Sequence, residues 1–341
     1  MIGPAGQVQP SLAGYKAVSR LYNALMTGLV LTLVTRRGED PAAAFVFGHF
    51  RRQHLEKFLP GLKKLGLDRL PDAVACAQYH YFSNALGGVK TEFMPESETQ
   101  AWVRYPPPRW IWQGTAICAV PRRVNEAMLH GWHGHNGVSL GNPRLGFVCT
   151  GQTVEGQPGL EGYYLDYGRP IAEDERVRFA PDETAPDFDP ALAPKLDSAD
   201  WPQDRLKKVE RSYAMEYVRS LVPTLIDLFG EADAAGLLAR TARLIGLQFY
   251  DETAEALGIE PGAPEAFATY LAAIAAAQGE SVSLEGATVL QTGWRLMDGL
   301  SPSPAVFEAW NALWTGALAV HNRRLTLESR FDGRAIVWRV A

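Results

Sequence analysis

The feature of this sequence that most restricts its fold is an internal repeat. When the chain is slid against itself by 192 positions, residues 29–68 align with residues 221–260 without a gap, and 12 of the 40 pairs are identical. Unrelated chains of average composition would match at roughly one position in fifteen. Shorter matches follow in the same order along the chain. The period is far longer than the roughly 20–50 residues of a solenoid repeat, so the sequence predicts two copies of one domain.

A change of composition separates the two copies. Residues 171–204 contain ten acidic residues, three basic residues and five prolines. Such a segment buries little apolar surface, and its prolines stop a helix from continuing. We therefore expect a first copy over residues 1–170, an acidic, proline-rich linker over 171–204 that packs on the surface, and a second copy over 205–341.

Both copies have the same order of predicted elements. Three- and four-residue apolar spacing predicts helices over 16–35, 41–65 and 72–86, matched by 206–229, 232–257 and 264–278. Strands follow over 89–93, 99–105 and 110–118, and over 281–284 and 289–297. A helix over 121–130 or 304–314 then precedes a closing hairpin, over 144–154 and 160–166 or over 324–330 and 335–340. The predicted fold class is α+β: two tandem duplicated domains, each with helices packed on a small antiparallel sheet.

Charge and cysteine content exclude several classes of function. The net charge is −5 with no block of lysine and arginine, which disfavours a nucleic-acid partner. The three cysteines, Cys76, Cys118 and Cys149, show no CxxC spacing, so a disulfide scaffold or a cysteine-rich zinc site is excluded. The start of the chain lacks the shape of a signal peptide, and no uninterrupted apolar run approaches the roughly 18 residues that span a membrane. We expect a cytoplasmic protein without a membrane partner, whose partners are a small-molecule substrate and, at most, a second copy of the chain.

Histidine is concentrated in the first copy, which holds six of the seven in the chain. The densest group follows Glu126 and comprises His130, His133 and His135, with glycines between them. Glu126 and His130 are four residues apart and therefore share one helix face. Imidazole exchanges protons near neutral pH, and a carboxylate one turn away orients it, so the pattern predicts a general acid–base site with the second copy mainly as scaffold.

Two other interpretations of this group remain open. Three histidines with an open fourth position could bind Zn²⁺, although the HExxH spacing is absent; otherwise we expect no cofactor. The histidines could also simply cap the end of a helix. His80, which has no counterpart in the second copy, is a further catalytic candidate. Aromatic and amide side chains nearby are candidates for substrate binding: Tyr79, Tyr81, Trp110, Trp112, Trp132 and Asn136.

The closing hairpin of the first copy resembles a known family. Its segments Asn142-Pro143-Arg144-Leu145-Gly146-Phe147, Gln152-Thr153-Val154-Glu155-Gly156 and Tyr163-Tyr164-Leu165-Asp166-Tyr167 look like the C-terminal end of the L-2-amino-thiazoline-4-carboxylic acid hydrolase-like family. The resemblance covers about residues 40–167. It departs from the family at the turn, where Gly159 and Leu160 replace the usual cysteine. The resemblance implies paired helices ahead of a small sheet and hydrolysis of a C–N bond in a ring.

The leading hypothesis is therefore a small-molecule enzyme that acts on a cyclic or aromatic substrate through histidine acid–base chemistry. In this hypothesis His133 or His135 activates water, Glu126 orients His130, and His80 or Tyr79 supports the developing charge. A lyase that eliminates a group from an aromatic substrate would use the same residues. A non-catalytic sensor that binds a small ligand is the third hypothesis.

Overall fold

A computed structural model describes residues 6–107, 114–195 and 202–341 of the chain. These residues form two compact units. Residues 33–202 make up what we call the five-strand unit, and residues 1–32 with 203–341 make up the four-strand unit. Both sheets are accompanied by helices, which confirms the predicted α+β class.

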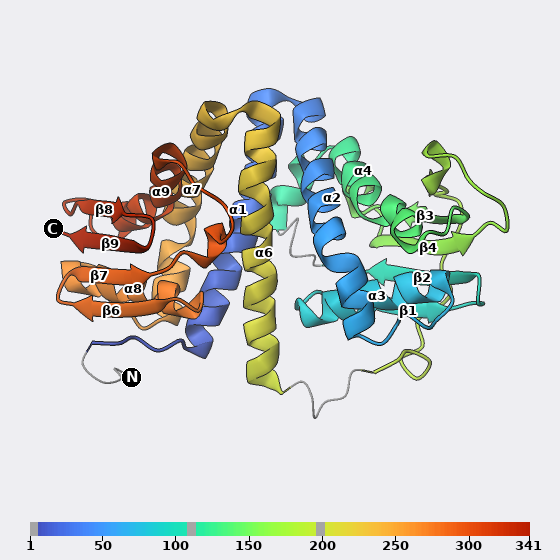
Figure 1. Ribbon diagram of the computed structural model, residues 1–341, viewed down its shortest axis with the longest axis horizontal. Coiled ribbons are helices and arrows are strands. Elements are labelled where there is room, and N and C mark those ends of the chain that lie inside the picture. Colours follow the sequence, from blue (N-terminus) through green and yellow to red (C-terminus); the bar gives the residue numbers. More distant parts are fainter. Residues whose placement is uncertain (1–5, 108–113, 196–201) are drawn as a thin grey trace. The chain divides into compact units, whose positions relative to one another are not determined.

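The five-strand unit begins with α2 (Glu39–Lys64) and α3 (Asp72–Leu86), followed by β1 (Glu92–Pro95) and β2 (Gln100–Tyr105). Next come α4 (Arg122–Gly131), α5 (Asn136–Leu140), β3 (Leu145–Gly151), β4 (Leu160–Asp166) and β5 (Val177–Phe179). The strand order is β1-β2-β4-β3-β5. Helix α3 packs on β1, β2 and β4, while α4 packs against α2 (Figure 1).

The four-strand unit contains most of α1 (Leu12–Arg37), together with α6 (Gln203–Phe229), α7 (Glu231–Ala256) and α8 (Pro264–Ala277). Strands β6 (Ser281–Glu285) and β7 (Thr288–Thr292) follow, then α9 (Pro304–His321), β8 (Leu327–Phe331) and β9 (Ala335–Val340). The strand order, β6-β7-β9-β8, is the same as that of the first four strands of the other sheet. Helix α8 packs on β6, β7 and β9.

The first 32 residues belong to the four-strand unit, whereas the predicted boundaries place them with residues 33–170. Close packing of α1 on α7 accounts for this difference. The buried hydroxyl of Thr241 donates a 2.9 Å hydrogen bond to that of Thr32. A Cβ on Gly28 would lie only 3.0 Å from Ile245, so the absence of a side chain there lets the two helices approach closely.

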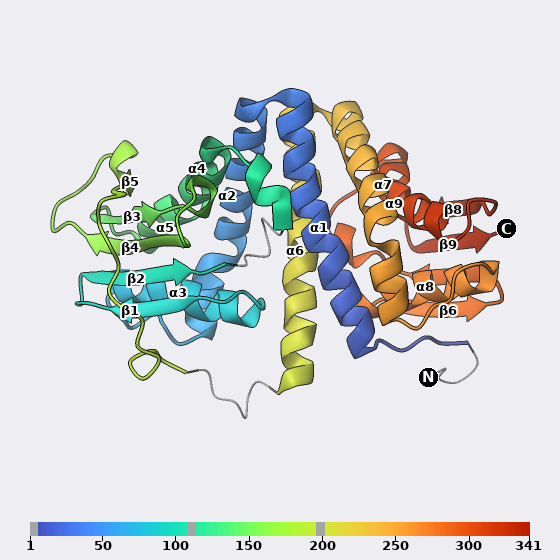
Figure 2. The same ribbon diagram turned by 180° about the vertical axis from the view of Figure 1, so that it is seen from behind.

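The two sheets differ in how their faces are covered. In the four-strand unit, buried and exposed residues alternate along β7 and β9, as expected when one face meets helices and the other meets solvent. In the five-strand unit all of β3 is buried. The second face of this sheet is covered by residues 180–188, which we call the strap and which Figure 2 shows running past the strands after β5. The predicted surface linker is thus in part a structural layer.

The structure corrects three predictions about secondary structure. Of the strand predicted over 110–118, residues 114–119 form a 3₁₀ helix, η1 (Gly114–Ala119), and the rest lie outside the described residues. Gly114 begins this helix with a left-handed φ of 58°, which does not fit an extended strand. The five-strand sheet is not purely antiparallel, because β5 pairs with β3 in parallel. Finally, a proline in a helix interior predicts a kink or an interruption, as at Pro60 and Pro223, but α2 and α6 each run through their proline without ending there.

Helix α1 is long and apolar enough to cross a membrane, judged by length and composition alone. No other helix among the described ranges has this combination. The search for uninterrupted apolar runs missed it, because polar residues such as Thr27 and Thr32 are spaced along it. Within the structure, 67% of the apolar stretch is buried, as it is in a helix that packs in a protein core.

Candidate functional site

Two of the predicted histidines meet between α3 and the five-strand sheet. The ring of His80, from α3, stacks on the ring of His133, with centroids 4.2 Å apart and planes 10° apart. A 2.7 Å hydrogen bond joins the Tyr164 hydroxyl to Nδ1 of His133, and Asn136 Nδ2 donates to the same hydroxyl at 2.9 Å. Because the hydroxyl accepts from Asn136, its own proton is available for His133. The structure thus joins three predicted residues to Tyr164, which the sequence analysis did not select.

Close packing explains the glycines around these residues. Helix α4 ends at Gly131, and the chain continues through the short 3₁₀ helix η2 (His133–His135) into α5. A Cβ on Gly131 would lie 2.7 Å from the carbonyl oxygen of Phe47, and one on Gly137 would lie 2.7 Å from that of Leu145. The glycines therefore let this segment approach α2 and β3.

Burial favours the neutral form of two histidines of this region, His80 and His54. It lowers the pKa of His80 to about 3. It also lowers the pKa of His54 to about 3, with a smaller contribution from the charge of His135. The Nε2 atom of His80 is buried and has no hydrogen-bond partner among the residues that the structure describes. A pKa this low makes the imidazole a weak base at neutral pH.

His135 lies beside His54, whereas Trp132 lies between His54 and the His80–His133 stack and also meets the ring of His80 edge-on, at a centroid distance of 6.0 Å. The ring of His54 meets those of His135 and Trp132 edge-on, at centroid distances of 5.2 and 5.4 Å. His54 also shares a 2.9 Å hydrogen bond with Ser139. The ring of Tyr79 is stacked parallel to that of Trp132, with centroids 6.4 Å apart. Through these contacts, the aromatic rings of α2, α3 and the α4–η2 segment pack against one another.

Glu126 and His130 lie one turn apart on α4 and share a face of this helix with Arg122. Neither side chain belongs to the group of rings around His54 and His80. The carboxylate of Glu126 accepts hydrogen bonds from Arg122 at 2.6 Å and from Gln152 at 3.3 Å. The ring of His130 packs against Phe179 of β5, with centroids 6.1 Å apart. Burial lowers the pKa of half-buried His130, and the charge of Glu126 opposes this effect. The predicted cluster is therefore divided between two places in the five-strand unit.

A groove lies beside the face of α4 that carries Glu126. It consists of two adjoining cavities of about 220 and 460 Å³, and both are lined by Thr150, Gly151, Gln157 and Pro181. The remaining residues of the smaller cavity are Arg122, Cys149, Gln152, Glu155 and Phe179. The larger cavity is also lined by Glu92, Arg104, Pro106, Pro158, Gly159, Glu161, Glu183 and Thr184. The larger cavity falls within the range of roughly 300–1,000 Å³ that is typical of small-molecule sites, and the smaller cavity extends the larger one.

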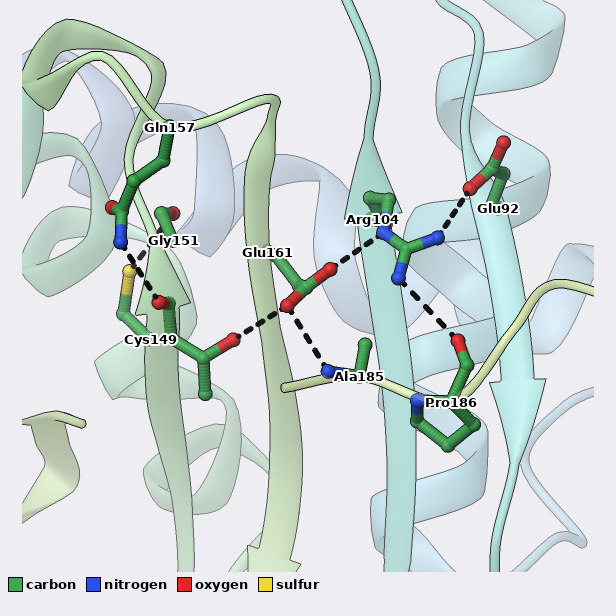
Figure 3. A network of polar contacts seen from close by, with 9 residues as sticks. Glu92, Arg104, Cys149, Gly151, Gln157, Glu161, Ala185 and Pro186 are labelled. Carbon is green, nitrogen blue, oxygen red and sulfur yellow. Dashed lines mark hydrogen bonds and ion pairs between the residues drawn. The ribbon is translucent and has the colours of Figure 1, made fainter. Parts of the chain in front are cut away.

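A network of charged side chains, Glu92, Arg104 and Glu161, lines the larger cavity. Figure 3 shows the contacts within this network. Arg104 donates to Glu161 at 2.5 Å and to Glu92 at 3.1 Å. Glu161 also accepts hydrogen bonds from Thr150 at 3.0 Å and from the backbone N–H of Ala185 at 3.2 Å. Only 15–24% of each of the three charged side chains is exposed. The network ties strands β1, β2 and β4 to the strap.

No residue of this network was among the site residues predicted from the sequence. Arg104 and Glu161 are directly opposite each other on neighbouring antiparallel strands. A charged residue between apolar neighbours in each of two predicted strands was the available signal, but the sequence alone did not show that these strands pair. Among the other candidates, Tyr81 packs against Phe82 and Phe93, away from the histidines. Trp110 and Trp112 lie outside the described residues.

No group of three or more histidine, cysteine, aspartate or glutamate side chains within residues 6–107, 114–195 and 202–341 is arranged to hold a metal ion. The three predicted histidine ligands, His130, His133 and His135, have different ring neighbours: Phe179, His80 and His54, respectively.

Comparison with known proteins adds no relative: no protein-family model matches the chain, and neither a curated protein nor a solved structure is significantly similar to it.

Proposed function

We propose that this protein is a small-molecule enzyme whose substrate binds in the groove of the five-strand unit. The observation that carries the proposal is the pair of adjoining cavities, the smaller of which is lined by Arg122 and Gln152, the two side chains that are hydrogen-bonded to Glu126. The lining combines charged, amide and hydroxyl groups with the ring of Phe179. Such a surface offers a polar ring compound both hydrogen-bond partners and a flat aromatic contact.

In this proposal, Glu126 and His130 supply the acid–base chemistry. Arg122 and Gln152 fix the carboxylate of Glu126, and both of these residues also line the smaller cavity. His130 packs on Phe179, another lining residue, and its lowered pKa leaves a neutral imidazole that can accept a proton from water. The resemblance of the closing hairpin to the thiazoline-carboxylate hydrolase-like family favours hydrolysis of a ring C–N bond over elimination.

The buried His80–His133 pair has a supporting role in this proposal. Its rings stack inside the core, and burial makes His80 a weak base. We assign proton transfer to His130 because its ring packs on Phe179, which lines the groove, whereas the rings of His133 and His135 contact His80 and His54.

A second candidate function is ligand binding without turnover. It is favoured by the charged network of the larger cavity, where Arg104 and Glu161 are already hydrogen-bonded to protein groups and are thus better suited to a rigid wall than to a reacting group.

We also propose that the two units arose by duplication of one domain. The ungapped match of 29–68 with 221–260 supports this origin, since the matched residues lie mostly in α2 and α7. The shared strand order is a second argument. A cytoplasmic location and a small-molecule partner remain part of the proposal.

A panel of cyclic C–N compounds tests the enzymatic function. Purified protein is incubated with 2-aminothiazoline-4-carboxylate, dihydrouracil and hydantoin, and ring opening is followed by mass spectrometry. For a compound that is turned over, His130→Ala should lower kcat by roughly 10²–10⁴. Glu126→Gln should cost less, because it removes orientation and charge rather than the proton carrier. The rate should fall on acidification with a midpoint below the usual imidazole value of about 6.5.

The comparison variant is His135→Ala, whose ring contacts His54 instead of Phe179. If His135→Ala loses turnover while His130→Ala keeps it, the proton-transfer residue is His135, beside His54, and the assignment to His130 is wrong. Turnover that a chelator abolishes and Zn²⁺ restores would replace the acid–base mechanism by a metal-dependent one. Saturable binding of a panel compound without any product would support the ligand-binding candidate.

A further inference from the structure

The four-strand unit contains a buried arginine without an acidic partner. Arg211, on α6, is 6% exposed. Its Nη1 donates to the carbonyl oxygen of Gln278 at 2.7 Å and to the sulfur of Met215 at 3.3 Å, while its Nε is buried without a hydrogen-bond partner in the described ranges. No carboxylate of those ranges lies within 4.0 Å of this guanidinium. A buried charge is normally paired, because an unpaired one is costly to remove from water.

A second guanidinium faces the same place. A Cβ on Gly279 would lie 3.6 Å from Nη1 of Arg211 and also 3.6 Å from Nε of Arg295, so both groups border one small volume beside this glycine. The nearest carboxylate, Glu280, accepts the backbone N–H of Arg295 at 2.6 Å and lies 4.0 Å from its Nε. Asp298 also acts on Glu280, and Arg219 donates to the carbonyl oxygens of Arg295 and Asp298. These five side chains form a cluster in which three guanidinium groups and two carboxylates leave an excess of one positive charge.

Further buried groups of the four-strand unit that can donate a hydrogen bond have no partner among the described residues, as does one acceptor, Oε1 of Gln291. The hydroxyl of Tyr22 and Nε1 of Trp294 are buried and have no hydrogen-bond partner in the described part of the chain. Tyr22 is fully buried and Trp294 is 5% exposed. Burial and the charge of Glu280 raise the pKa of Tyr22, and the charge of Arg211 opposes them, which places Tyr22 in the same electrostatic cluster. The guanidinium of Arg211 also lies over the ring of Tyr15, 5.3 Å from its centroid.

We propose that the four-strand unit binds a small oxyanion, the carboxylate or phosphate group of a metabolite, between Arg211 and Arg295 beside Gly279. Guanidinium groups match the geometry of both anions, and the Tyr22 hydroxyl and Trp294 indole add neutral donors. The ring of Tyr15 provides a flat contact for a ligand with an aromatic body. This site lies in the unit that the sequence analysis treated as scaffold, and it does not depend on the groove of the five-strand unit.

Isothermal titration of the full-length protein with inorganic phosphate, acetate and benzoate tests the proposal, at constant ionic strength maintained with sodium chloride. We expect saturable one-to-one binding of at least one of these anions. Arg211→Gln should weaken it at least tenfold. Trp294→Phe, which keeps an aromatic ring but removes the N–H, should weaken it severalfold. Tighter binding of benzoate than of acetate would show that the ligand's aromatic body contributes to binding. A preference for phosphate would identify a phosphate group, rather than a carboxylate, as the bound anion.

A second arginine variant keeps the test decisive if Arg211→Gln fails to fold. The Arg295 side chain is 60% exposed, so Arg295→Gln should fold and should still weaken binding about tenfold. The matched control is Arg330→Gln, which removes an exposed charge on β8 of the same unit and should bind as the unmodified protein does. The proposal is overturned if no anion binds saturably, as expected when only ordered water satisfies these donors. Equal weakening in Arg330→Gln would also overturn it, because binding would then follow net charge alone.

Discussion

The imidazole of His80 lies face to face with that of His133, with ring centroids 4.2 Å apart and planes 10° apart. Two charged rings could not be packed in this way, since like charges at this distance in a buried site repel strongly. Burial lowers the pKa of His80 to about 3, so the ring is neutral near pH 7. The stack therefore excludes simultaneous protonation of the two rings, and His80 is the ring whose neutral form burial favours.

The first prediction concerns acid stability. The pKa of His80 falls from 6.5 to about 3 on folding, so its contribution is fully present above pH 6.5 and is lost as the pH falls toward 3. In this range each unit by which the pH falls lowers the free energy of unfolding by up to about 1.4 kcal/mol, because the unfolded state binds the proton and the folded state does not. His80→Gln should therefore show a shallower loss of stability between pH 6.5 and 4.5, measured by urea unfolding. Tyr79→Phe, a neighbouring change without a titrating group, should keep the original slope, and equal slopes for all three proteins would refute the assignment.

Helices were the part of the fold that the sequence predicted well. Their apolar spacing is local, so α2, α3 and α4 were expected within a few residues of their observed bounds. The strand predicted over 110–118 was wrong where it can be checked, at η1. Its alternation of apolar and polar residues did not reveal the turn at Gly114.

The candidate site was harder to predict, because it depends on pairing between distant strands. His130 and His133 are close in sequence, so the local pattern predicts one group. In the structure their rings pack against different residues, Phe179 and His80. The Arg104–Glu161 pair joins residues 57 positions apart, so local patterns carried no signal for it. The acidic, proline-rich composition of the strap predicted a surface linker. It did not indicate that Ala185 and Phe188 pack on the sheet.

The second prediction tests the charged network that lines the groove. Arg104→Met would leave Glu92 and Glu161 facing each other across a largely buried site without their shared cation. Breaking such a pair should lower the free energy of unfolding by about 3 kcal/mol. Arg123→Met, which breaks the exposed pair with Asp40, should change it by no more than about 1 kcal/mol. Thermal unfolding of the two variants checks this difference, and similar losses in both would show that the network is solvent-screened.

The third prediction compares two glycines of one helix. A Cβ on Gly246 would lie 2.0 Å from the carbonyl oxygen of Leu313 in α9, so Gly246→Ala must push α7 and α9 apart. We expect a loss of about 2–3 kcal/mol, as for other overpacked interiors. Gly236, also in α7, has no atom within 4 Å of its Cβ position, and Gly236→Ala should stabilise the helix by about 0.5–1 kcal/mol. Chemical denaturation of both variants gives the comparison, and it would contradict the packing if Gly246→Ala were neutral.

The last prediction concerns the three thiols. The apolar sequence around Cys118 and Cys149 predicts two buried core thiols. The structure buries Cys149, together with Cys76, but places Cys118 at the surface of η1. Burial raises the pKa of Cys149 to about 12, and its Sγ donates to the carbonyl oxygen of Gly151.

Since the thiolate is the reactive form, Cys118 should be the one thiol that reacts rapidly with Ellman's reagent near pH 8. All three should react after unfolding, and Cys118→Ser should lose the fast phase. Cys149 lines the smaller cavity of the groove. A second fast phase that disappears in Cys149→Ser would show that the groove opens far enough to expose this thiol, contrary to its buried position in the structure.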